Sequence, residues 1–287
     1  MKNRLVGLCL AIALTQTPSA SAWSYTENFN EGAVDQSIQG SVPLTQASGG
    51  TTFSTDYGLM ETTSAKMSIA EGETGFGTWG AAWNFPEPLA EGDELWISFS
   101  IYIPSSFVID TPRNGSLKFI RIRTKNSDGS LGGYNDFQIV DDDTTLNSVY
   151  RYINEERADL GWSLIGERSS IESLLPRDRW FNLEIYFRFD EKSEKEGGNA
   201  NIKVWIDNTR IWDAQEVATL GDSTDHADAF YLFTYWNGGA PKTQSLYIDN
   251  LEITTSEPTK RDTQNFPFIG AGKNGMAPKP PIRVEVN

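Results

Sequence analysis

Hydrophobic and polar positions alternate along several stretches of the chain between Trp23 and Thr255. Every second residue is apolar in the stretches 95–103, 183–189 and 202–206. A period of two is typical of β-strands that turn one face toward a core. Turn-forming clusters such as Asn126-Ser-Asp-Gly separate the stretches. Helical periodicity is confined to two short segments, 154–164 and 171–175.

Many antiparallel strands with one apolar face need a second sheet to bury that face. We therefore predict an all-β protein, a two-sheet antiparallel β-sandwich or jelly roll with a concave groove, over residues 23–255. From Ser256 the character changes, and five prolines are spread over 256–287. This composition predicts an extended C-terminal tail and not a second domain.

The first 22 residues have the pattern of a secretory signal peptide. Lys2 and Arg4 precede an apolar run over 5–14, and small residues surround the expected cleavage site after Ala22. The run is shorter than the roughly 20 residues that a transmembrane helix needs, and no later segment is apolar enough to cross a membrane. We expect a secreted or periplasmic protein with no membrane partner.

The composition excludes several kinds of chemistry. One histidine and one cysteine cannot form a zinc site or support a Cys–His nucleophile pair, and Cys9 lies within the predicted signal peptide. The sequence has neither a phosphate-binding loop nor a dinucleotide-binding glycine pattern, so we expect no organic cofactor. A formal net charge of −15 disfavours nucleic acid as a partner.

Arginine, amide and aromatic side chains occupy the alternate, outward positions of four predicted strands. They are Arg121 and Arg123; Tyr134, Asp136 and Gln138; Tyr186 and Arg188; and Tyr231, Phe233, Tyr235 and Asn237. Aromatic rings stack on sugars, while guanidinium and amide groups bind hydroxyls and carboxylates. The pattern predicts a polysaccharide-binding groove. The alternative is an ordinary solvated sheet face, where such residues are common.

Three of these segments resemble the groove strands of alginate-lyase-type jelly rolls: Lys118-Phe-Ile-Arg-Ile-Arg, Gln138-Ile, and Tyr231-Leu-Phe-Thr-Tyr-Trp-Asn. That concanavalin A-like superfamily also contains glucuronan, heparin and ulvan lyases. The resemblance implies a catalytic group of Tyr235, Arg121 and Gln138, and substrate contacts from Arg123, Lys118, Tyr134, Tyr186, Tyr231 and Asn237. One position departs from the pattern, because the histidine of the Gln-x-His strand falls at Val140. The lone His226 lies in a polar segment and is expected to be solvated.

Lyases of this kind take the proton beside a uronate carboxylate, so the enolate-like intermediate must be stabilised. A base and an acid are also required, and one tyrosine serves as both where neighbouring cations favour its phenolate. Lys118 is a rival base, although its parity with Ile120 turns it inward unless the strand bulges. We expect a monomeric lyase acting on alginate, glucuronan or ulvan. The alternative is a non-catalytic carbohydrate-binding jelly roll, which Val140 favours.

A structural calcium ion is a further expectation from the resemblance. Similar jelly rolls often hold calcium between the first and last strands, where this chain has Glu27 and Asp249. Carboxylate oxygens are ligands that calcium accepts. The alternative for Asp249 is a carboxylate satisfied by hydrogen bonds.

Overall fold

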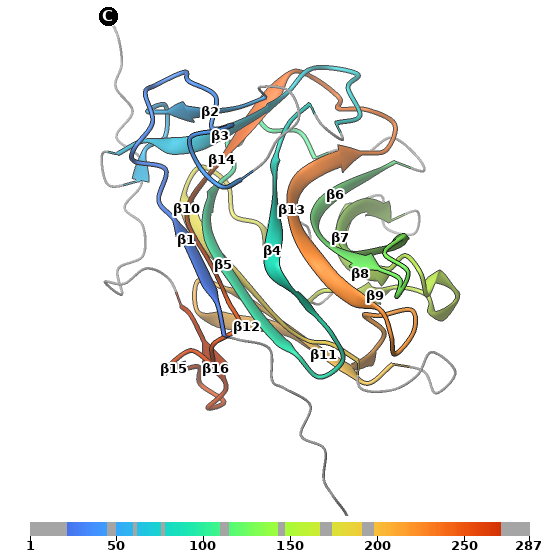
Figure 1. Cartoon of the computed structure of the whole chain (residues 1–287). Coiled ribbons are helices and arrows are strands. Elements are labelled where there is room, and N and C mark those ends of the chain that lie inside the picture. The colour runs from blue at the N-terminus through green and yellow to red at the C-terminus, as the bar shows by residue number, and fades with distance from the viewer. Residues whose placement is uncertain are drawn as a thin grey trace, which may run out of the picture.

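The computed structural model describes residues 22–44, 50–59, 62–75, 78–109, 115–142, 147–166, 174–190 and 198–270, with only the backbone of 141, 142, 147 and 148. Two large antiparallel sheets pack against each other (Figure 1). The predicted two-sheet β-sandwich of the jelly-roll type is therefore confirmed. Of the predicted signal peptide, all but Ala22 lies outside the described residues, as does the tail beyond Gly270.

The first sheet has eight strands. In spatial order they are β12 (Thr209–Val217), β11 (Ala200–Ile206), β10 (Trp180–Arg188), β5 (Glu94–Tyr102), β14 (Gln244–Thr254), β3 (Ser64–Ile69) and β2 (Thr51–Ser54), with β1 (Ser24–Glu27) also paired to β14. β1 and β14, the first and last strands of the sandwich domain, are thus hydrogen-bonded neighbours in this sheet.

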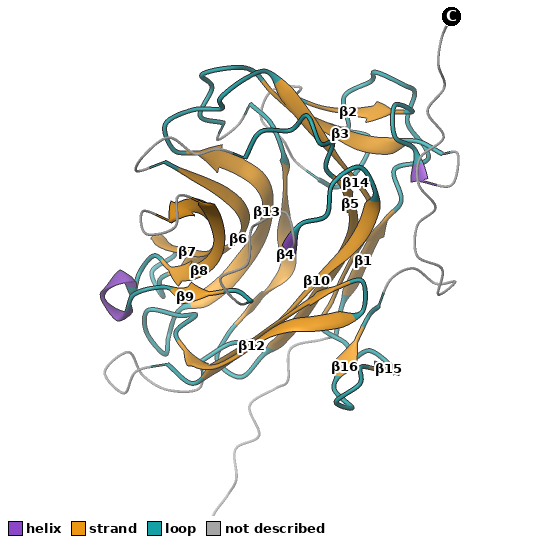
Figure 2. Ribbon diagram, turned by 180° about the vertical axis from the view of Figure 1, so that it is seen from behind, coloured by secondary structure: helices purple, strands orange, loops and turns teal. Residues whose placement is uncertain are grey.

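The second sheet has six strands. In spatial order they are β4 (Ala81–Leu89), β13 (His226–Trp236), β6 (Ser116–Lys125), β7 (Leu131–Asp142), β8 (Asn147–Asn154) and β9 (Ser163–Leu164). β13, β6 and β7 bend into arcs whose hollow side faces away from the first sheet (Figures 1 and 2). The segment 154–164, one of the two with helical periodicity, contains a single 3-10 turn, η2 (Ala158–Leu160).

The apolar positions of both sheets meet between them. Phe99 of β5 contacts Phe230 of β13 at 6.4 Å between ring centroids, and Phe137 of β7 contacts Phe187 of β10 at 5.7 Å. All four side chains are fully buried. Burial of a large apolar side chain contributes roughly 1.5–3 kcal/mol, so this layer supplies the main stabilisation of the fold.

Two neighbouring strands of the second sheet bulge at the same level. The pairing register shifts between Lys118 and Ile120 in β6 and between Leu232 and Tyr235 in β13. Phe119 and Phe233 lie at these bulges, and their rings pack at 4.6 Å in the core. In β6 the extra residue reverses the facing of the strand beyond it, so Lys118 is turned outward. In β13 Phe233 is in the core, so the outward position predicted for it is wrong, while Tyr235 keeps its outward facing.

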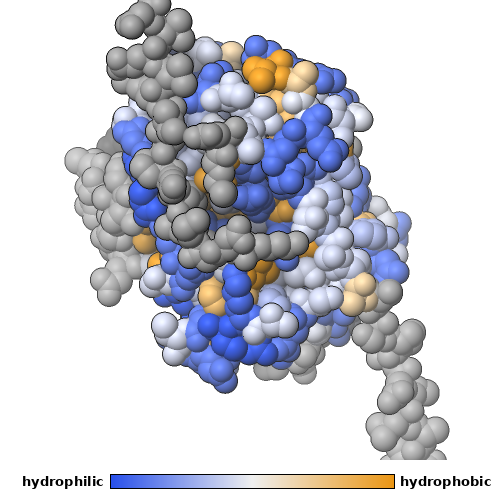
Figure 3. Space-filling view, turned by 90° about the vertical axis from the view of Figure 1, so that its left-hand side faces the viewer, coloured by the Kyte–Doolittle hydropathy of each residue, from blue (hydrophilic) through white to orange (hydrophobic). Residues whose placement is uncertain are grey.

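A small hairpin of β15 (Lys260–Arg261) and β16 (Pro267–Phe268) follows the sandwich. Phe268 packs on Trp205 of the first sheet, at 6.1 Å, and the Trp96 indole donates to the Pro267 carbonyl at 3.2 Å. The start of the predicted tail is thus folded onto the outer face of the first sheet. Seen from that side, the surface is mainly hydrophilic, with scattered apolar patches (Figure 3). The described part of the chain contains no helix with the length and apolarity of a membrane span.

Candidate functional site

Most of the predicted site residues lie on the concave, outer face of the second sheet, which we call the site face. Directly opposed residues of antiparallel neighbours project from the same face. The register opposes Arg121 to Asp136 and Tyr231, Arg123 to Tyr134, and Lys118 to Gln138 and Tyr235. Asn237 follows β13, and its N–H donates to the Ser116 carbonyl at 2.8 Å. The structure therefore brings Tyr235 and Arg121 to one face.

Asp136 lies at the centre of the site face and is fully buried. Its carboxylate accepts from Arg121 Nε at 2.6 Å and from Gln138 Nε2 at 3.0 Å, and Lys118 Nζ lies 2.9 Å away. A second carboxylate, Glu155, follows β8 and contacts both Lys118 and Arg121, the latter at 3.1 Å. Two cations are thus compensated by two carboxylates.

The two carboxylates have opposite pKa shifts. Burial by itself raises the pKa of Asp136, but the Arg121 and Lys118 cations outweigh it and leave that pKa below its ordinary value. Burial and the adjacent Asp136 carboxylate raise the pKa of Glu155, although Lys118 and Arg121 oppose the shift. The side chain of Glu155 is 30% exposed, whereas that of Asp136 is inaccessible to solvent. Glu155 is therefore the more accessible carboxylate of the pair.

The other predicted arginine is also paired. Arg123 binds Asp228 through two hydrogen bonds of 2.6 and 2.8 Å and donates to the Tyr231 hydroxyl at 2.8 Å. Arg121 stacks on the Tyr134 ring, with its guanidinium carbon 3.5 Å from the ring centroid. Sequence reasoning did not assign Glu155 or Asp228 as counter-ions, because both depend on contacts between distant segments.

Tyr235 is half-buried on β13 and is the cross-strand partner of Lys118. The position where the family pattern has histidine, Val140, lies two residues beyond Gln138 on the site face, opposite Val149, and is only 6% exposed. An apolar residue thus occupies the place of the implied proton-transfer group. His226 begins β13 opposite Lys125, nine residues before Tyr235.

Tyr186 is not on the site face. It belongs to β10 of the first sheet, is 2% exposed, and packs on Trp96 and Phe266 at 5.0 and 4.9 Å. Its hydroxyl donates to Glu94 at 2.5 Å. The prediction that Tyr186 shares a groove with Tyr235 is therefore corrected, since strand alternation does not reveal to which sheet a strand belongs.

The residues expected to bind calcium lie on the paired strands β1 and β14, and burial, with a smaller contribution from the negative charge of Glu27, raises the pKa of Asp249. Glu27 is opposed to Leu251, whose side chain is in the core, whereas Asp249 is opposed to Ser100 on the outer face of the first sheet. The Glu27 carboxylate accepts the Phe29 N–H at 2.7 Å, and Asp249 accepts the Asn250 N–H at 2.7 Å. Among the described residues, no group of three or more His, Cys, Asp or Glu side chains is placed to hold a metal. A calcium ion at Glu27 and Asp249 therefore stays a prediction, and further ligands would have to come from backbone carbonyls or water.

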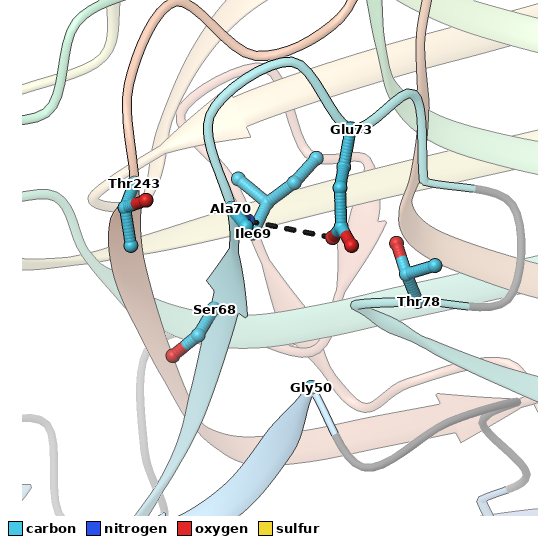
Figure 4. Close-up of a pocket in the computed structure, with 7 residues that line it drawn as sticks. All are labelled: Gly50, Ser68, Ile69, Ala70, Glu73, Thr78 and Thr243. Atoms are coloured by element: carbon cyan, nitrogen blue, oxygen red, sulfur yellow. Dashed lines mark hydrogen bonds between the residues drawn. The ribbon is translucent and has the colours of Figure 1, made fainter.

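A small surface pocket lies elsewhere, where the ends of β3 and β2 approach the start of β14 (Figure 4). Its lining residues are Gly50, Ser68, Ile69, Ala70, Glu73, Thr78 and Thr243. The Glu73 carboxylate accepts the Ala70 N–H at 3.5 Å. Glu73 is the single ionisable side chain in its lining, so this pocket has neither the cations nor the tyrosine that gather on the site face.

No protein-family model matches the chain, and no curated protein matches its sequence. Solved structures do match it. The alginate lyase Aly36B superposes with a TM-score of 0.57 at 12% identity, over 80% of this chain and 96% of that one. A variant of Aly36B in complex with alginate tetrasaccharide gives 0.56 at 13% identity, with the same coverage. The endo-β-1,4-glucuronan lyase of the fungus Trichoderma reesei gives 0.50 at 12% identity, over 81% and 95%. At these identities the likeness shows a shared fold, the jelly roll of alginate and glucuronan lyases.

Proposed function

We propose that this protein is a secreted polysaccharide lyase that cleaves an acidic, uronate-containing polysaccharide such as alginate, glucuronan or ulvan by β-elimination. The observation that carries the proposal is the gathering of Tyr235, Lys118 and Arg121 on one concave face. The lyase-like fold supports it. Export by the predicted signal peptide is part of the proposal.

The site face has a means of neutralising a substrate carboxylate. Glu155 contacts Arg121 and Lys118 from the more exposed side, while Asp136 holds the same two cations from below. A uronate carboxylate displaces Glu155 and takes over its contacts. Asp136 then keeps both cations in place, so little rearrangement is needed when negative charge develops in the transition state.

Proton transfer falls to Tyr235. Its phenolate takes the proton beside the carboxylate, the electron pair forms the new carbon–carbon double bond, and the bond to the leaving sugar oxygen breaks. The tyrosine then gives its proton to that oxygen, so atoms and charges balance without a co-reactant. Lys118, between two carboxylates, serves as a cation and not as the base.

The test is a cleavage assay that follows the ultraviolet absorbance of the unsaturated product on alginate, glucuronan and ulvan. Cleavage of at least one polymer is expected. Tyr235→Phe is expected to lower the rate by roughly 10²- to 10⁴-fold, the usual contribution of general acid–base catalysis, with an unchanged melting temperature and retained polymer binding. Full rate in this variant, or no product from any polymer with the wild type, contradicts the proposal.

A second candidate is a carbohydrate-binding protein without catalysis. The observation that favours it is Val140, an apolar residue at the position of the family histidine. This function gives polymer binding by the wild type and by Tyr235→Phe alike, without an unsaturated product from either.

A further inference from the structure

Arg151 extends the site face by one strand beyond the predicted residues. It is opposed to Gln138 on β7 and to Leu164 on β9. Its guanidinium donates from Nε and Nη2 to Gln138 Oε1 at 3.3 and 3.0 Å, and the same amide donates to Asp136. Three strand spacings separate β8 from Tyr235, a distance of roughly 14 Å. Arg151 therefore belongs to a neighbouring part of the face and not to the reacting position.

The hydrogen-bond partner of Arg151 differs in charge from those of its neighbours. Lys118, Arg121 and Arg123 each contact a carboxylate. Within the described part of the chain, Arg151 makes no ion pair, and its hydrogen-bond acceptor is the neutral amide oxygen of Gln138. Nη1 and the second N–H of Nη2 point away from that oxygen as an end-on fork. Such a fork binds a carboxylate through two parallel hydrogen bonds.

An exposed tryptophan lies beside this fork. Trp162 is 48% exposed, in the segment that joins η2 to β9, and its ring centroid lies 5.6 Å from the Arg151 guanidinium carbon. A large, half-exposed aromatic ring contributes little to the core of this domain, whereas such rings are suited to stacking on a sugar. A charged fork and an apolar platform thus stand next to each other.

We propose that Arg151 and Trp162 form a separate subsite that binds one uronate unit of the polysaccharide, with the carboxylate on Arg151 and the sugar ring against Trp162. The choice of an acidic sugar rests on the proposed function. The subsite selects charge without displacing an internal carboxylate, because Gln138 holds Arg151 in place and leaves its outer donors available. At Arg121 and Lys118, in contrast, the substrate carboxylate has to displace Glu155.

The experiment measures binding by calorimetry in the Tyr235→Phe background, which keeps the polymer intact. The probes are alginate and glucuronan and the carboxyl-reduced, neutral form of each. Arg151→Gln is expected to weaken binding of the acidic polymer roughly tenfold or more, as for loss of a charged hydrogen-bond pair, and to leave binding of the neutral form unchanged. Trp162→Ala is expected to weaken both forms by a similar factor.

Two further variants separate a subsite from a structural or long-range effect. Arg151→Lys keeps the charge but lacks the planar fork, so it is expected to recover only part of the affinity. Arg261→Gln removes one positive charge from the exposed C-terminal hairpin, where Arg261 pairs with Glu257, and is expected to leave binding unchanged. Melting temperatures check that each variant is folded.

The outcomes also separate this inference from the proposed function. If the wild type forms unsaturated product but Arg151→Gln binds the acidic polymer normally, the subsite is wrong and the lyase stands. If no polymer is cleaved but Arg151→Gln loses charge-selective binding, the lyase is wrong and the subsite stands. If the Tyr235→Phe protein does not distinguish acidic from neutral polymer, or binds neither, the subsite is wrong.

Discussion

The outer faces of the two sheets have the same alternating sequence pattern, but their aromatic residues differ in how far they are covered by other parts of the chain. On the first sheet, Tyr186 and Trp205 are covered by the C-terminal hairpin, through Phe266 and Phe268. On the second sheet, the described chain leaves Trp162 exposed and Tyr235 partly accessible. Alternation therefore identifies outward residues, but what later packs on them decides whether they contribute to stability or to binding.

The buried carboxylates of the two sheets also differ, in the direction of their pKa shifts. Asp136, on the site face, is held by two cations, and its pKa is lowered in spite of burial. On the first sheet, burial raises the pKa of Asp249 to about 8 and that of Glu184 to about 7. Glu184 accepts the N–H groups of Ile269 and Gly270, which anchors the C-terminal hairpin. Neighbouring cations thus lower the pKa of the buried carboxylate Asp136, whereas burial dominates for Asp249 and Glu184 and raises the pKa of both.

The largest effect is expected from Asp136→Asn. Removal of one partner from a buried ionic cluster leaves Arg121 and Lys118 undercompensated, which costs roughly 3–5 kcal/mol of unfolding free energy. Urea unfolding at neutral pH measures the loss. Asp249→Asn is the matched control, because it removes a buried carboxylate that has no cation partner among the described residues. Equal losses in the two variants contradict the contrast between the faces.

Asp249 is expected to make stability depend on pH. Its raised pKa means that the folded protein keeps a proton that the unfolded chain releases above about pH 4. The free energy of unfolding therefore falls by about 1.4 kcal/mol per pH unit from this group between pH 4 and 8. Asp249→Asn is expected to remove this slope, seen as the difference between wild-type and variant unfolding curves. A constant difference over that range shows that Asp249 does not titrate there.

Glu155→Gln is expected to act on substrate binding. The variant removes the anion that competes for Arg121 and Lys118, so the KM for an acidic polymer falls by roughly two- to fivefold, as for a partly exposed ion pair. Steady-state kinetics on the polymer that the wild type cleaves measures it. A higher KM means that Glu155 itself contacts substrate and is not displaced by it.

The smallest effect on function is expected from Tyr186→Phe. The loss of the hydrogen bond to Glu94 lowers the unfolding free energy by about 1 kcal/mol, and the cleavage rate and polymer binding stay at wild-type values because the residue lies under the hairpin. Thermal melts and the cleavage assay are run on the same preparation. A loss of polymer affinity places Tyr186 at the substrate and overturns the division between the faces.

The sequence predicts the two-sheet sandwich because alternating apolar and polar residues, as along 95–103, indicate strands that bury one face in a core. It misplaces Phe233 and leaves the facing of Lys118 dependent on a bulge, since a bulge has no fixed pattern in composition. The predicted site lacks Arg151 because no strand is predicted over 147–154. Alternation of Tyr150 and Tyr152 with Val149 and Arg151 is the signal that predicts its facing.

The paired bulges also bear on how this site changes during evolution. In β6, loss of the one extra residue at Phe119 restores plain alternation and turns Lys118 from the site face toward the core. The end of the face that carries Lys118 can thus be changed by a single deletion. The rest of the sheet keeps its pairing, so new binding specificities become accessible without rebuilding the core.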